Sequence, residues 1–98
     1  MALYAISYDL VGRNRPPEDY FRIATTIVEL GSSCSPTDSF WLLETVKTRD
    51  QVADALFASR GVGASDHLVI VELTGRGDYY GGPRRDSAVW LDNHMVRV

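Results

Sequence analysis

The clearest β-strand in this sequence is DHLVIVEL, residues 66–73. Its central residues, Leu68 to Val71, are all apolar, so neither face of the strand is polar. Strands with this pattern are covered on both faces. We therefore expect helices on one side of the sheet that contains this strand. On the other side we expect a second cover, for which a partner subunit is one candidate.

A strand and a helix are predicted at the start of the chain. Residues 2–9 alternate between two faces, as a strand does. Its ring-bearing and branched side chains share one face: Tyr4, Ile6 and Tyr8. The helix is expected over about residues 17–30, because Pro17 suits a first helical turn and Gly31 can cap the end.

Two further strands are expected in the middle of the chain. Residues 32–36 form a short, weak candidate, and residues 40–46 form a strong one. Phe40 and Trp41 are neighbours in the stronger strand, so their side chains point to opposite faces of the sheet. They therefore cannot both fill the same core.

A second helix is predicted over about residues 49–59. Thr48, with Gln51 three residues later, has the form of a capping box, which satisfies the first backbone N–H groups of a helix. Apolar residues then follow at helical spacing: Val52, Ala55, Leu56 and Ala58. Gly61 breaks the pattern.

These elements predict an α+β fold of the order β-α-β-β-α-β. This order is the ferredoxin-like sandwich, a four-stranded antiparallel sheet with two helices on one face. We assign residues 1–75 to this domain and residues 76–98 to a C-terminal extension. Residues 76–86 are rich in glycine and charge and are expected to be mobile, whereas residues 88–91 are expected to dock.

Composition limits the function. The chain has 98 residues and a formal net charge of −3, which argues against strong non-specific binding to nucleic acid. Arg13 and Arg15 lie in one loop, and they are the candidate contacts if RNA or DNA binds locally. The single cysteine, Cys34, cannot form an intrachain disulfide, and no run is apolar and long enough for a membrane span. We expect a cytoplasmic protein.

The candidate catalytic and metal-binding residue is Asp9, which ends the first strand. Its carboxylate suits a hard cation such as Mg²⁺, although a turn-forming role is the commoner explanation for an aspartate at this position. One carboxylate does not build a metal site, but two copies across a dimer axis would supply two. His67 flanks the strand of residues 66–73, where it is either a general base or an exposed strand-end histidine. The sequence contains no HExxH, CxxC, GxSxG or Walker pattern.

Four stretches of the chain resemble one protein family. They are the strand end SYDL (residues 7–10), the helix end at residues 30–31, the segment DSFWL (38–42) and the strand LVIVELTG (68–75). Together they are similar to the Cas-two family of CRISPR adaptation, and most of all to its SinR-like relatives. The similarity covers about residues 2–75.

The resemblance implies a ferredoxin-like fold and a two-fold homodimer. It also implies two alternative functions. The first is a binding or scaffold module for nucleic acid or a protein partner. The alternative is a metal-dependent endoribonuclease or nuclease, in which paired Asp9 carboxylates across the dimer hold Mg²⁺ or Mn²⁺.

Overall fold

The computed structural model of the chain describes residues 1–12, 15–82, 84 and 87–96. The helices and strands follow in the order β1 (Ala2–Asp9), α1 (Pro17–Leu30), β2 (Ser32–Thr37), β3 (Phe40–Thr45), α2 (Arg49–Ala58), β4 (His67–Leu73) and α3 (Ser87–His94). Up to β4 this is the predicted β-α-β-β-α-β order, so the α+β, ferredoxin-like class is confirmed. Within the described residues, no helix combines the length and the apolar composition that crossing a membrane requires.

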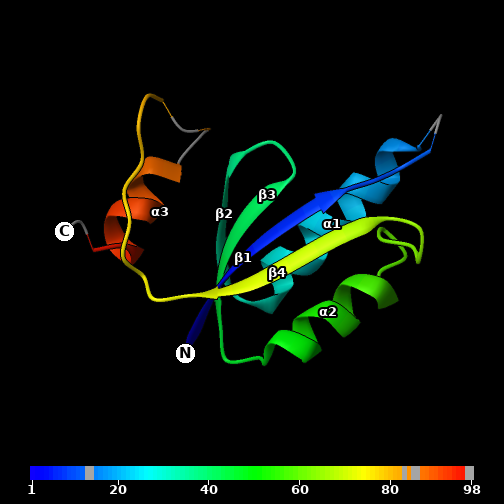
Figure 1. Ribbon diagram of the computed structural model, residues 1–98, viewed down its shortest axis with the longest axis horizontal. Helices are drawn as coiled ribbons and strands as arrows, with labels where there is room; N and C mark the ends of the chain where they lie inside the picture. The colour runs from blue at the N-terminus through cyan, green and yellow to red at the C-terminus, as the bar shows by residue number, and fades with distance from the viewer. Residues whose placement is uncertain (13–14, 83, 85–86, 97–98) are drawn as a thin grey trace.

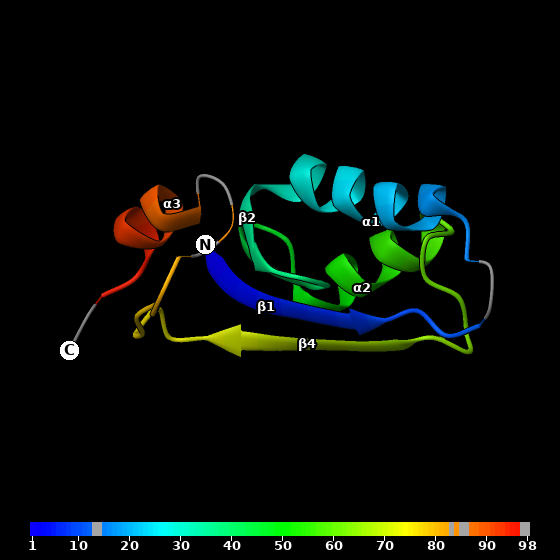
Figure 2. The same ribbon diagram turned by 90° about the horizontal axis from the view of Figure 1, so that it is seen from above.

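The four strands form one antiparallel sheet in the order β2-β3-β1-β4. The strand β1 is central, paired with β3 on one side and with β4 on the other. Helices α1 and α2 lie together on one face of the sheet (Figure 2). The two edges of the sheet are β2 and β4.

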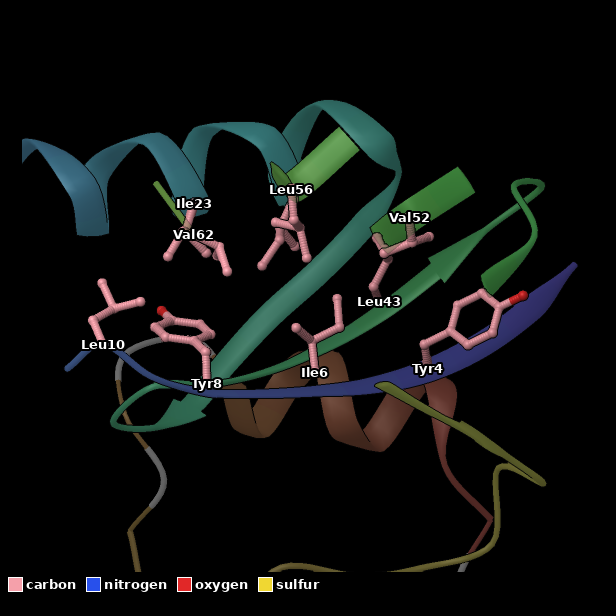
Figure 3. Close-up of a cluster of buried hydrophobic side chains, with 10 residues drawn as sticks. Tyr4, Ile6, Tyr8, Leu10, Ile23, Leu43, Val52, Leu56 and Val62 are labelled. Carbon is pink, nitrogen blue, oxygen red and sulfur yellow. The ribbon is translucent and has the colours of Figure 1, made fainter. Parts of the chain in front are cut away.

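The main core lies between the sheet and these two helices. Tyr4, Ile6 and Tyr8 of β1 point from the sheet toward the helices, as their alternation predicted (Figure 3). The fully buried side chains of this core are Ile6, Ile23, Ile27, Leu43, Val52 and Leu56. The predicted capping box also forms at α2, because Thr48 accepts from the Gln51 backbone while the Gln51 side chain accepts from the Thr48 backbone.

The helix α3 lies on the opposite side of the sheet from α1 and α2 (Figure 1). Its buried Leu91 packs with Cys34 of β2 and Leu42 of β3, and Phe40 lies beside them. Trp41 packs instead with the main core, so Phe40 and Trp41 do face opposite sides. The sheet therefore carries a second, smaller core on the side of β2 and β3.

The C-terminal extension is tied back to the domain by its backbone. Gly77 donates to the Val96 carbonyl over 3.1 Å, and Val96 donates to the Gly75 carbonyl over 2.8 Å. The expectation that residues 76–86 are mobile stays a prediction, and residues 83, 85 and 86 of that segment lie outside the described part of the chain.

Gly61 allows the loop after α2 to lie directly on α1, and this close approach can be tested. A Cβ atom at residue 61 would lie 2.6 Å from the Asp19 carbonyl oxygen and 2.7 Å from Cγ1 of Ile23. Because the first obstacle is backbone, we expect Gly61→Ala to destabilise the fold by about 1–3 kcal/mol in urea unfolding. Gly63→Ala is the matched control, since its Cβ would meet only Asp66 Oδ2 at 3.6 Å. Equal stability of both variants would contradict the tight packing.

Candidate functional site

Asp9 is exposed at the end of β1 and lies directly opposite His67 of β4 in the sheet register. Opposed residues of antiparallel strands share a face, with Cβ atoms about 5 Å apart. Both side chains are therefore on the face away from α1 and α2, where one ligand can reach a carboxylate and an imidazole together. Sequence reasoning named each residue separately and missed the pair, because only the β1–β4 register brings them together.

The Asp9–His67 pair offers few ligands for a metal ion. Among the residues that the structure describes, no group of three or more histidine, cysteine, aspartate or glutamate side chains is placed to hold one. Mg²⁺ prefers six oxygen ligands, and one protomer supplies a single carboxylate at this position. The residues of one chain therefore do not fit a Mg²⁺ or Mn²⁺ site, and such a site would need a second copy.

Arg15, a predicted nucleic-acid contact, has its guanidinium turned inward. Its Nη2 donates to Asp66 Oδ2 over 2.8 Å and to the Gly61 carbonyl over 3.2 Å. Its Nε lies 3.1 Å from Asp19 Oδ2, which is ion-pair distance, although the N–H is poorly aligned for a hydrogen bond. The side chain is 24% exposed. Arg15 thus joins the loop after β1 to α1 and to the loop before β4. Arg13 lies outside the described residues.

Asp66 is the centre of this ion-pair network. Its side chain is 1% exposed and accepts hydrogen bonds from the backbone N–H groups of Gly63 (2.8 Å) and Val11 (3.0 Å). The Gly63 hydrogen bond, with those from Val11 and Arg15, lowers the pKa of Asp66 against the opposing effect of burial. The network fixes the chain on either side of the Asp9–His67 pair.

A groove of about 700 Å³ lies at the β2 edge of the sheet, between α1, the β2–β3 turn and the start of α3. Tyr8 lines it, and its hydroxyl accepts a hydrogen bond from Trp41 Nε1 over 3.2 Å. Burial raises the pKa of Tyr8. The charged residues on its wall, Arg84 and Asp38, pair with each other over 2.8 Å. Neither Asp9 nor Arg15 lines this groove.

Cys34 also borders the groove but is buried and free. Burial raises the pKa of its thiol, and a hydrogen bond with Ser87 opposes the effect. A raised pKa leaves less of the nucleophilic thiolate at neutral pH. The environment therefore favours a structural thiol over a nucleophile.

His94 helps to hold α3 on the sheet. Its ring stacks on Trp90, with centroids 3.8 Å apart and planes 6° apart. Its Nδ1 lies 2.7 Å from the Trp90 carbonyl oxygen, so Nδ1 carries the proton, because a carbonyl only accepts. Trp90 Nε1 donates to the Ser32 hydroxyl of β2 over 2.9 Å.

On the face of the sheet away from α1 and α2, no helix of the described residues covers Val69 and Val71 of β4. Val69 and Val71 of β4 point to this face, opposite Ser7 and Ala5 of β1. They are 56% and 49% exposed although they lie at the centre of the strand. We call the four residues Ala5, Ser7, Val69 and Val71 the open strip. The second cover that the sequence predicted is therefore partial: α3 supplies it over β2 and β3, and the same small core reaches Ala5 of β1 and Leu73 of β4.

Four of the described arginines pair with carboxylates: Arg15, Arg22, Arg49 and Arg84. With a formal net charge of −3, a surface of this kind attracts phosphate weakly.

The Asp66 network predicts a pH-dependent stability. The folded protein holds the pKa of Asp66 below its ordinary value of 3.8, so the ionised carboxylate stabilises the fold at neutral pH. This stabilisation is lost as the pH falls below about 4 and through the lowered pKa. We expect Asp66→Asn to reduce the free energy of unfolding at pH 7 and to flatten its decline in acid, measured by urea unfolding from pH 7 to pH 2.

The exposed Asp54→Asn of α2 is the control for this experiment. Its free energy of unfolding should change with pH as that of the wild type does. If the free energies of unfolding of wild type and Asp66→Asn differed by the same amount at every pH, the lowered pKa of Asp66 would be contradicted.

Comparison with protein families, curated proteins and solved structures finds no match to this chain. Its similarity to the Cas-two family and to the SinR-like proteins therefore stays a prediction.

Proposed function

We propose that the chain is a homodimeric, non-catalytic binding module and that two copies meet along β4, where the open strip reaches the edge of the sheet. The observation that carries the proposal is the exposure of Val69 and Val71 at the centre of β4. Contiguous apolar surface of this kind marks an interaction site more often than scattered apolar residues do. A dimer also suits a small domain with a modest core.

The valines alone do not give a stable dimer. Fully burying a valine contributes about 1.5–3 kcal/mol, and these side chains are already half buried. The four valines of two copies then supply about 4 kcal/mol, which corresponds to millimolar affinity. Further contacts along β4 must supply the rest.

The charge distribution favours a protein partner over RNA or DNA for such a dimer. Arg15 is used inside the fold, and Arg84 is paired with Asp38. We place the protein in the cytoplasm, because a single buried thiol suits a reducing compartment.

A second candidate function is a metal-dependent nuclease that uses Asp9 of two copies. The observation in its favour is that Asp9 and His67 oppose each other on the uncovered face. Two copies stacked through these faces would bring together two carboxylates and two imidazoles, which is enough to bind Mg²⁺ or Mn²⁺ with water.

The dimer is tested first by mass. Sedimentation equilibrium of the wild type at micromolar concentration should give twice the chain mass of 10.9 kDa. Val71→Lys should weaken association at least tenfold, because a charged side chain would replace an apolar contact in the interface. Val28→Lys is the matched control: Val28 lies on α1 and is 59% exposed, close to the exposure of Val69. A wild type that stays monomeric up to about 100 μM would overturn the proposal.

The two candidate functions are separated by a cleavage assay. Single- and double-stranded RNA and DNA are incubated with wild type and Asp9→Asn in Mg²⁺ or Mn²⁺. A binding module gives equal, background cleavage in both proteins and leaves the dimer intact. Loss of a metal-dependent activity in Asp9→Asn, with the dimer retained, would establish the nuclease instead.

A further inference from the structure

We infer that two copies of this chain join by antiparallel pairing of β4 with β4, which makes one continuous sheet of eight strands. The inference rests on the proposed homodimer and specifies its interface. It concerns the edge of the sheet as well as the open strip, because Val69 and Val71 lie on the outermost strand.

The two edges of the sheet differ in how they resist pairing with another strand. Proteins protect edge strands with proline, bulges, charge or a covering element. The β2 edge has Pro36, a register shift between Cys34 and Thr37, and α3 packed against it. The β2 edge is therefore closed to further strands.

The β4 edge has fewer of these protections. All seven residues from His67 to Leu73 pair with β1 in unbroken register. The strand contains no proline and no lysine, and Glu72 is its only acidic residue. A long, regular and apolar edge of this kind is a template for another strand.

A second copy of β4 fits this edge in one favoured register. A two-fold axis normal to the sheet leaves each side chain on its own face. Opposed residues must share a face, so their residue numbers are both even or both odd and their sum is even. With Ile70 opposite Ile70 of the second copy, every residue from His67 to Leu73 has a partner. Val69 then lies opposite Val71 of the second copy, and the two open strips become one apolar band.

Charge supports the same register. When Ile70 is on the axis, each Glu72 lies opposite Leu68 of the other copy, so no carboxylates meet. A register shifted toward the start of β4, with Val69 on the axis, would place Glu72 of one copy opposite Asp66 of the other. The backbone N–H of Asp66 is already bound to the Gly63 carbonyl over 3.0 Å, so Asp66 cannot extend the pairing in that register. Like charges directly opposite each other are also destabilising.

This interface places the two Asp9 side chains far apart. Each Asp9 lies opposite His67, which is three residues along β4 from the axis. Asp9 is also one strand further from the axis than β4 is. Strand spacings of about 4.8 Å and residue rises of about 3.4 Å then put the two Asp9 residues roughly 25 Å apart. One cation cannot bridge them, so the edge-paired dimer and the paired-carboxylate nuclease exclude each other.

The test is cysteine cross-linking in a Cys34→Ala background. Opposed residues have Cα atoms about 4.5–5.5 Å apart, within the range of a disulfide. We expect Ile70→Cys to form a disulfide-linked dimer under mild oxidation at least ten times faster than Val69→Cys. In this register the two cysteines at residue 70 are directly opposite each other, whereas those at residue 69 are two residues apart along the strands. Val28→Cys on α1 is the surface control. If Ile70→Cys does not fold, the double variant Val69→Cys/Val71→Cys tests the same register, because these positions oppose each other.

A spin label on Asp9→Cys gives an independent distance in the same background. A distance of roughly 25 Å supports edge pairing, and one below about 15 Å overturns it in favour of stacked faces. A dimer by sedimentation whose β4 cysteines link no faster than Val28→Cys would overturn the β4 interface and leave the proposed homodimer standing. A monomer by sedimentation would overturn both.

Discussion

The period-two alternation of β1 is the constraint on which the rest of the structure depends. This strand is paired on both sides, so its register places side chains of β3 and β4 as well as its own. Tyr4, Ile6 and Tyr8 fix the helix-covered face, and Ala5, Ser7 and Asp9 are thereby sent to the other. A slip of one residue would exchange the two sets, which burial of the main core forbids.

Much of the fold could be predicted because its signals are local. The capping box at Thr48 and Gln51, the proline that opens α1 and the alternation in β1 all act within a few residues. The site could not be predicted in the same way. Arg15 and Asp66 are 51 residues apart, and the loop arginine gives no sign that it pairs inward. The juxtaposition of Asp9 and His67 depends in turn on the β1–β4 register.

The position of α3 has an effect on function that composition does not reveal. This helix packs over β2 and β3, whereas Val69 and Val71 of β4 stay exposed on the same face, so this face of the sheet has a closed half and an open half. The closed half ends in a groove with paired charges, and the open half ends in the Asp9–His67 pair. The exposed apolar surface of this face therefore lies along β4, at the edge of the sheet.

The same arrangement gives each face of the sheet its own tryptophan. The sequence contains two, and Trp41 lies in the main core while Trp90 lies on α3, stacked against His94. Trp41 donates its N–H to a tyrosine hydroxyl, whereas Trp90 donates to a serine of β2. The two indoles therefore absorb and emit in different surroundings. Their separate fluorescence signals distinguish detachment of the C-terminal helix from melting of the domain beneath it.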